Sequence, residues 1–310
     1  MLSSALAFIV VVHAACLQQN DAEVGRLTTE AEVVLVQGTN LPLPTGREEK
    51  DLAGIPRLEH PEWLSSALVS EYARMHGYAH RIYLYKAPYE AACEHPKRGP
   101  LKAQWCKILA LRVAFQDFPR ARTIVWLDTD VFLMNMATTI DQVMENTKTV
   151  RFQPITDNST CTEEEPPLGR DNVSVFTWKN SLWDGGCGVC TGAMIFRRTA
   201  ATAEFLEQWW DNAMGPKIPG PYDQGFFARM LYYDHPDKVA VFNEDSFHMA
   251  RDGGFLVHRL KKAKWLLQLP DLYRTAVMQQ RLIKPAGSML AAALTNLDRQ
   301  ISGTAPATAT

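Results

Sequence analysis

The sequence predicts one α/β domain in which a mainly parallel central sheet is flanked by helices. Between residues 32 and 127, short apolar runs alternate with amphipathic segments. The hydrophobic share of 46% and the charged share of 21% are ordinary for a chain that buries a core. Parallel strands joined by right-handed crossovers are the expected result of this alternation, and such sheets bind ligands beyond the carboxyl ends of their strands.

Hydrophobic spacing defines five elements in the first half of the chain. Pro61 suits the first turn of a helix, and Gly77 suits the cap that ends it. The run at 123–127 is almost entirely apolar, as in a strand buried on both faces. In chain order the sequence predicts a strand at 32–36 closed by a turn at 37–39, a helix at 61–78, a strand at 81–85, a helix at 101–118 and a strand at 123–127.

The second half of the chain is less regular, although capping and turn signals still divide it. Thr199 is placed to cap the start of a helix. The expected elements are a strand at 192–196, a helix at 200–213, a helix at 222–233, a strand at 239–242 and an extended segment at 253–258.

The net charge and the N-terminal segment limit which partners the protein is expected to have. With 32 Lys and Arg against 34 Asp and Glu, the formal charge of −2 leaves no global field that would attract nucleic acid. Residues 1–16 include an apolar stretch that suits a signal peptide or a short membrane anchor. Glycosylation sequons at Asn158 and Asn172 support entry into the secretory pathway. Six cysteines favour structural disulfides, with Cys161 as one candidate.

Asp128-Thr129-Asp130 follows the buried strand at 123–127 and is the strongest chemical signal in the chain. Two acids two residues apart point the same way if the extended backbone continues. Close carboxylates repel each other, and a divalent cation removes the conflict. Their hard oxygens suit Mg²⁺ or Mn²⁺, and either ion can bridge a diphosphate and neutralise the charge of a phosphate leaving group.

Two classes of enzyme use such a carboxylate pair. Phosphatases of the haloacid dehalogenase type place Asp-x-Asp after an apolar strand, and the segment at 124–133 fits that pattern with Asp128 as the nucleophile. Against this interpretation, two strand–helix units precede the motif here, whereas the motif normally opens that fold. Nucleotide-sugar glycosyltransferases are the other class.

A set of segments carries a wider resemblance to the second class. They are the strand at 33–36, the Tyr-Ala-Arg-Met-His-Gly-Tyr sequence at 72–78, the helix at 104–115, the segment at 126–135, and the segments at 191–198, 223–227 and 254–260. In this order they resemble glycosyltransferase family 34, the group of galactosyl-, mannosyl- and xyloglucan xylosyltransferases. The resemblance implies a GT-A fold and a retaining transfer of a hexose or pentose from a nucleotide-diphospho-sugar, with UDP-galactose favoured, to a glycan hydroxyl.

The resemblance also implies a metal site. Asp128 and Asp130 match the DxD motif that holds the metal, Mn²⁺ or Mg²⁺, together with the nucleotide-sugar. His258 matches a third metal ligand, with His248 as its rival, and a neutral imidazole nitrogen suits Mn²⁺. The predicted metal site therefore joins the end of a buried strand to a segment far along the chain.

Further matching positions are expected close to the donor. Asp223 and Gln224 match a pair that lies near the transferred sugar in this family. Lys107 lies in the middle of a helix and either contacts hydroxyls of the donor or acceptor, or carries its charge to solvent. The other positions expected at the nucleotide-sugar are Gly38, Thr39, Gly192, Lys261 and Lys262.

The expected organisation has four parts, with the catalytic domain at its centre. They are a signal peptide or short anchor at 1–16, a GT-A domain at 30–265, a C-terminal helical extension at 266–301 and a disordered tail at 302–310. The expected partners are a nucleotide-sugar donor and a glycan acceptor, with membrane contact only through the N-terminal segment. The expected location is the secretory pathway, in the Golgi lumen. The alternative to an active transferase is an inactive relative that binds glycan.

Overall fold

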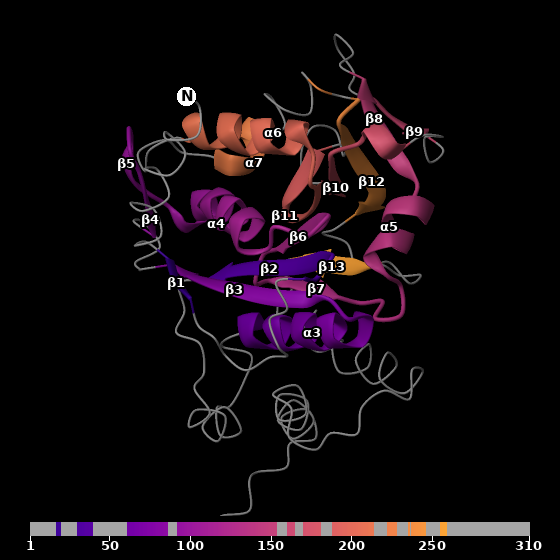
Figure 1. Cartoon of the computed structure of the whole chain (residues 1–310). Coiled ribbons are helices and arrows are strands. Elements are labelled where there is room, and N and C mark those ends of the chain that lie inside the picture. The colour runs from indigo at the N-terminus through magenta and orange to yellow at the C-terminus, as the bar shows by residue number, and fades with distance from the viewer. Residues whose placement is uncertain are drawn as a thin grey trace, which may run out of the picture.

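Figure 1 shows the computed structural model of the whole chain. The structure describes residues 17–19, 30–39, 61–85, 92–153, 160–164, 170–180, 188–213, 222–227, 235, 237–245 and 255–258. Outside these residues lie the predicted N-terminal segment at 1–16, the extension at 266–301 and the tail at 302–310, together with His248, Lys261 and Lys262. Within the described ranges, no helix has both the length and the apolar composition that a membrane span needs.

A sheet of nine strands forms the centre of the described part of the chain. From one edge to the other, the strands are β1 (Leu17–Gln19), β3 (Ala79–Tyr85), β2 (Val33–Thr39), β6 (Thr123–Leu127), β11 (Gly188–Arg197), β10 (Val175–Asn180), β12 (Val239–Asp245), β8 (Thr149–Gln153) and β9 (Thr160–Glu164). Two short pairs lie outside this sheet. They are β4 (Cys93–His95) with β5 (Gly99–Leu101), and β7 (Val131–Leu133) with β13 (Leu256–His258).

Five strands of the sheet share one direction, and β11 runs opposite to them at the centre. β2 is parallel to both β3 and β6, and β10 is parallel to β12. β11 is antiparallel to its neighbours β6 and β10, so that β10 and β12 run in the same direction as β6. The carboxyl ends of β2, β3, β6, β10 and β12 therefore meet at one edge. This arrangement confirms the predicted α/β class.

Helices cover both faces of the sheet (Figure 1). The helix α3 (Pro61–His76) lies on one face, while α4 (Ala103–Asp117), α6 (Ala200–Asp211) and α7 (Tyr222–Phe226) lie on the other. The shorter helix α5 (Ile140–Asn146) and the 3₁₀ turn at Arg170–Asn172 belong to the connections between strands. Two separate layers of helices are what a sheet buried on both sides requires.

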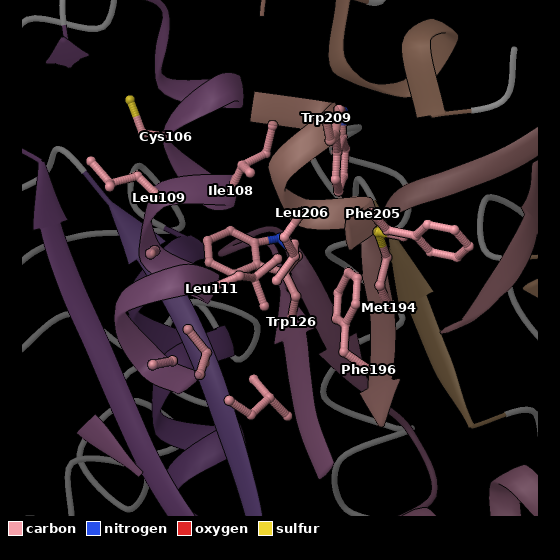
Figure 2. Close-up of a cluster of buried hydrophobic side chains, with 14 of the residues drawn as sticks. Cys106, Ile108, Leu109, Leu111, Trp126, Met194, Phe196, Phe205, Leu206 and Trp209 are labelled. Atoms are coloured by element: carbon pink, nitrogen blue, oxygen red, sulfur yellow. The ribbon is translucent and has the colours of Figure 1, made fainter. Parts of the chain in front are cut away.

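Two hydrophobic clusters form because successive residues of a strand point to opposite faces of the sheet. The cluster beneath α4 and α6 receives Val34, Val36, Ile124, Trp126, Met194 and Phe196 from the strands. The cluster beneath α3 receives the alternate residues Val33, Leu35, Val125, Leu127, Ala193 and Ile195. Figure 2 shows Trp126 of β6 among side chains of α4 and α6. The sheet is consequently buried on both sides at its centre.

The local signals in the sequence located most elements, and one prediction was wrong. Gly77 ends α3 with a positive φ of 69°, and the Thr199 side chain accepts from the backbone N–H of Thr202 at the start of α6, both as predicted. The predicted turn at 37–39 is instead the end of β2, because Gly38 and Thr39 pair with β3. Partner strands override the turn preference of a glycine in this position.

A disulfide ties the small β4–β5 hairpin to the body of the domain. It joins Cys93 of β4 to Cys106 in the first turns of α4. Both sulfur atoms belong to buried residues. The prediction of structural disulfides is thus met by one pair, while Cys161, the candidate named from the sequence, lies in β9. The disulfide fixes the N-terminal part of the helix that also carries Lys107.

Candidate active site

The Asp-x-Asp motif lies at the edge where the parallel strands end. Asp128 directly follows β6, and its backbone N–H donates to the carbonyl of Gly192 on β11 at 2.6 Å. The chain then turns, since the N–H of Val131 donates back to the carbonyl of Asp128 at 2.9 Å. The extended backbone therefore does not continue through both acids, and the condition under which they would point the same way is not met. Both Asp128 and Asp130 remain partly exposed at this edge.

The carboxylate of Asp128 is held by two groups that the fold places beside it. The indole N–H of Trp126, two residues earlier on the same face, donates to Oδ1 of Asp128 at 2.7 Å. The ammonium nitrogen of Lys107 lies 3.2 Å from the same oxygen. The Asp128 side chain still exposes 29% of its surface. Asp128 is thus fixed in position without being sealed from a ligand.

Lys107 is the central cation of the site. It projects from α4, and only 4% of its side chain is exposed. Besides Asp128, its Nζ lies 3.0 Å from Oδ2 of Asp223 and donates to the carbonyl of Thr191 at 3.0 Å. Burial by itself lowers the pKa of Lys107, but the two carboxylates outweigh burial and raise its pKa above the ordinary value. Lys107 is charged and does not extend into solvent.

Asp223 is the second carboxylate beside Lys107, and unlike Asp128 it is buried. It lies in the first turn of α7 and is 6% exposed as a residue. The hydroxyl of Thr191 donates to its Oδ2 at 2.9 Å, and the indole N–H of Trp209 donates to its backbone carbonyl at 3.1 Å. Gln224, the next residue, is partly exposed. These contacts join α4, α6, α7, β6 and β11 in one polar cluster.

Gly38 and Tyr85 form the part of this edge that lies at the ends of β2 and β3. A Cβ atom on Gly38 would collide with the ring and hydroxyl of Tyr85 and with the ring of Trp126. Burial first, and then the negative charges of Asp128 and Asp223, raise the pKa of Tyr85 well above its ordinary value. Gly38 therefore has a packing role. Its predicted role in nucleotide binding, and that of the buried Thr39 beside it, stay predictions.

The pairing of β13 with β7 brings a distant segment to the Asp-x-Asp motif. In this antiparallel pair, His258 stands opposite Val131, the residue that follows Asp130. The backbone of the predicted third metal ligand is therefore next to the predicted first two. The rival ligand, His248, and the two lysines predicted at the phosphate lie outside the described residues.

The charge of this edge fits a divalent cation. Asp128, Asp130 and Asp223 supply three carboxylates at this edge, and Lys107 is the cation that the described contacts place among them. Among the described residues, no cluster of three His, Cys, Asp or Glu side chains is assembled as a complete metal site. Two carboxylates with open coordination positions suit Mg²⁺ or Mn²⁺, because these ions take their remaining ligands from water and substrate phosphates. The donor set present thus fits the predicted ion.

Three residues of the cluster were not singled out as site residues from the sequence. The sequence predicts only that Trp126 is a core aromatic residue. In the structure, its indole N–H also donates to Asp128. Thr191 immediately precedes Gly192, and its hydroxyl binds Asp223. Tyr85 ends β3 and read only as part of an alternating strand. A usable signal existed for Trp126 alone, because residues i and i+2 of a strand share a face.

The fold and this edge define a class of protein, an α/β enzyme with a carboxylate pair at the carboxyl ends of its parallel strands. Residues 69–239 match the model of the galactosyl transferase GMA12/MNN10 family. Because the match spans more than half of the chain, the protein belongs to this family and is a glycosyltransferase. The family resemblance predicted from the sequence is confirmed. No curated protein matches the chain.

The solved structures similar to this chain include two distant ones. One is a glycosyltransferase involved in the glycosylation of the major capsid of PBCV-1, with 18% identity and a TM-score of 0.48, covering 75% of this chain and 94% of that chain. The other is A197 from STIV, with 11% identity and a TM-score of 0.33, covering 68% and 82%. At these scores, neither likeness bears on the chemistry of this chain.

Proposed function

We propose that the protein is a metal-dependent retaining glycosyltransferase that moves a hexose or pentose from a nucleotide-diphospho-sugar to a glycan hydroxyl. UDP-galactose is the favoured donor, and Mn²⁺ or Mg²⁺ is the expected ion. The observation that carries this proposal is the buried ion pairing of Lys107 with Asp128 and Asp223 at the carboxyl edge of the sheet. Such an arrangement holds charged groups rigidly at a ligand-binding edge, as electrostatic catalysis requires.

The need for a metal follows from the excess of negative charge. A diphosphate approaching Asp128 and Asp130 would be repelled by both carboxylates. A divalent cation bound there, with His258 as a further ligand, would neutralise charge on the departing nucleotide diphosphate. Lys107 compensates charge deeper in the site, where it contacts Asp128 and Asp223. The metal and the lysine thus have separate tasks.

The remaining predicted residues surround the donor in this proposal. Gly192 lies next to the site through its hydrogen bond from Asp128, and a residue without a side chain allows close approach of a ligand to the backbone. Gln224 is partly exposed beside Asp223 and would reach the hydroxyls of the transferred sugar. Gly38 and Thr39 at the end of β2, with Lys261 and Lys262, would bind the nucleotide and its phosphates.

Retention of configuration is proposed to occur on one face of the sugar. The bond from the anomeric carbon to the phosphate oxygen breaks while the acceptor oxygen bonds to that carbon from the same side. The acceptor's proton passes to the departing phosphate oxygen, so a separate protein base is not required. A covalent intermediate on Asp223 is disfavoured, because only 8% of its side chain is exposed and its Oδ2 already contacts Lys107 and Thr191.

The phosphatase interpretation of Asp128 loses its support. The family match covers the motif, and one of the two carboxylate oxygens of Asp128, Oδ1, already accepts a hydrogen bond from Trp126. An attacking carboxylate needs an accessible lone pair in line with its target. Lys107 near both oxygens of Asp128 further lowers their nucleophilicity.

Location in the secretory pathway, in the Golgi lumen, is part of the proposal. The Cys93–Cys106 disulfide supports it, because disulfides persist in oxidising compartments. Asn172 of the second sequon is exposed and so accessible to glycosylation. Expression of the full chain in a eukaryotic secretory host, followed by digestion with a glycosidase, tests this: a mobility shift is expected, and an unchanged chain in the cytosol contradicts it.

The decisive experiment measures hydrolysis of UDP- and GDP-sugars by the purified protein with and without Mn²⁺. We expect slow, metal-dependent cleavage of one donor, and a fall of at least about 100-fold in Asp128→Asn and Asp130→Asn. Asp141→Asn is the matched control, since Asp141 binds Arg122 on the exposed surface of α5. Parent rates in both site variants would overturn the proposal. Binding of UDP with Mn²⁺ but no transfer to any glycan would instead indicate an inactive glycan-binding relative.

A further inference from the structure

Tyr85 has a buried hydroxyl for which the described part of the chain offers no hydrogen-bond partner. The residue ends β3 and is 7% exposed, and its ring packs over Gly38, whose missing Cβ position is also bordered by the ring of Trp126. The two other tyrosines that are buried among the described residues have hydrogen-bond partners. The hydroxyl of Tyr83 donates to Asp117 at 2.9 Å, and that of Tyr72 donates to the carbonyl of Thr138 at 2.6 Å. Tyr85 is the exception among these three.

A buried hydroxyl without a hydrogen-bond partner destabilises the fold, and packing alone does not explain why this position carries one. Phenylalanine would fill the same space above Gly38 without burying a polar atom. Gly38 lacks the Cβ that would collide with this hydroxyl, so the backbone of β2 is shaped to admit it. A polar group kept under these conditions points to a partner that is absent when the site is empty.

The place of Tyr85 identifies that partner. The ends of β2 and β3 belong to the same edge as Asp128, where parallel sheets bind their ligands. Trp126 borders the same space at Gly38 that the Tyr85 hydroxyl fills, and its indole N–H donates to Asp128, so the tyrosine lies beside the carboxylate cluster. Burial first, and then the charges of Asp128 and Asp223, raise the pKa of Tyr85, so the hydroxyl keeps a proton to donate.

We infer that the Tyr85 hydroxyl donates a hydrogen bond to an oxygen of the bound nucleotide-sugar and thereby fixes the donor at the ends of β2 and β3. This inference rests on the proposed function, because the ligand is the donor of that reaction. Phosphate, ribose and sugar oxygens share the required acceptor chemistry. Tyr85 is thus a binding residue for the donor, additional to the residues predicted from the sequence.

The test compares two tyrosine variants that differ by one hydroxyl each. In Tyr85→Phe, we expect the melting temperature without ligand to stay the same or rise, and the affinity for UDP-galactose with Mn²⁺ to fall about 5- to 30-fold. In Tyr83→Phe, the matched control, the lost bond to Asp117 should lower the melting temperature and leave the affinity unchanged. Calorimetric titration and thermal unfolding measure the two quantities independently of turnover.

The ligands used in the titration separate the possible outcomes. An equal loss of affinity for UDP and UDP-galactose places the bond on the nucleotide, whereas a loss for UDP-galactose alone places it on the sugar, and both support the inference. Unchanged affinity in Tyr85→Phe overturns the inference. If the parent protein still binds UDP-galactose, the proposed function is unaffected by that result. A parent that binds neither UDP- nor GDP-sugars overturns both. A lowered melting temperature with unchanged affinity would make the hydroxyl a structural group.

Discussion

The ammonium nitrogen of Lys107 lies 3.0 Å from Oδ2 of Asp223, and both side chains are almost completely buried. The two residues belong to different helices, α4 and α7, which contact each other. A buried pair of this kind holds its elements in register, since neither charge tolerates the loss of the other. The candidate site is therefore also a stabilising contact of the fold.

Removing the lysine should destabilise the protein strongly. We expect Lys107→Met to lower the free energy of unfolding by about 3 to 5 kcal/mol, because it leaves the buried Asp223 without a counter-charge. Urea denaturation followed by circular dichroism measures the change. Lys97→Met is the control, since Lys97 and Asp211 form an exposed pair at 3.8 Å that contributes less than about 1 kcal/mol.

The double variant Lys107→Met with Asp223→Leu distinguishes charge from packing. The loss of stability in Lys107→Met is expected to come from the uncompensated carboxylate of Asp223. In that case, the double variant should be at least about 1 kcal/mol more stable than the sum of the two single effects predicts. Additive effects would mean that Lys107 stabilises the fold only through the packing of its aliphatic chain. A loss below about 1 kcal/mol in the single variant would contradict the burial argument altogether.

A buried chain of hydrogen bonds makes the stability of the protein depend on pH through His80. Nδ1 of His80 lies 2.8 Å from the Ser70 hydroxyl, and its Nε2 lies 3.2 Å from the side-chain oxygen of Gln37. Gln37 in turn donates to Ser65, which donates to the carbonyl of Val131 beside the Asp-x-Asp motif. A neutral imidazole satisfies every link, with Ser70 as donor and Gln37 as acceptor.

Burial lowers the pKa of His80 to about 3, against 6.5 in the unfolded chain. The unfolded state therefore binds a proton as pH falls below 6.5, while the folded state does not do so until about pH 3. Stability is lost over this window, by about 2 kcal/mol between pH 7 and pH 5. Urea denaturation at both pH values should show this loss in the parent and not in His80→Gln. Equal losses in the two proteins would contradict the assignment to His80.

The packing of Tyr85 over Gly38 leads to a prediction about backbone space. Gly38→Ala should lower the free energy of unfolding by about 1 to 3 kcal/mol, because the added methyl group collides with Tyr85 and Trp126. Gly225→Ala in α7 is the control, since no atom lies within 4 Å of its added Cβ. Thermal and urea unfolding measure both. In a Tyr85→Ala background, Gly38→Ala should cost much less, and an unchanged cost would show that Tyr85 is not the obstacle.

Much of the site's framework could be predicted from local sequence, because the signals involved act within one element. The apolar run before Asp128 marked a buried strand, and the positive φ of Gly77 followed from its place at a helix end. The family segments added Asp223 and His258 as candidates. These predictions needed only the spacing of apolar residues, the capping signals of the helices and the order of the family segments.

The contacts that organise the site could not be predicted in this way, because they depend on how distant elements dock. Lys107 has the same helical spacing whether it extends into solvent or turns toward the sheet, and only the packing of α4 beside β11 decides between the two. The turn predicted at 37–39 is wrong because these residues pair with β3, and that pairing is non-local in sequence. Likewise, nothing in the sequence sets His258 opposite Val131.

The Cys93–Cys106 disulfide yields the last prediction. It joins two cysteines that are 13 positions apart in the sequence. Such a crosslink raises the free energy of unfolding by about 3 kcal/mol, because it restricts the conformations of the unfolded chain. Cys93→Ala with Cys106→Ala should therefore lower the stability by about that amount. Because Cys106 directly precedes Lys107 on α4, the variant should also weaken binding of UDP with Mn²⁺. Urea denaturation and calorimetric titration measure the two effects.

Reductant provides the matched control for this variant. Dithiothreitol should reduce the stability of the parent toward that of the double alanine variant, because it opens the same bond. A variant as stable as the oxidised parent would contradict the contribution of the disulfide. If stability falls while UDP affinity is unchanged, then the hydrogen bonds of Lys107 to Asp128 and Thr191 are sufficient to position this lysine without the covalent link at the preceding residue.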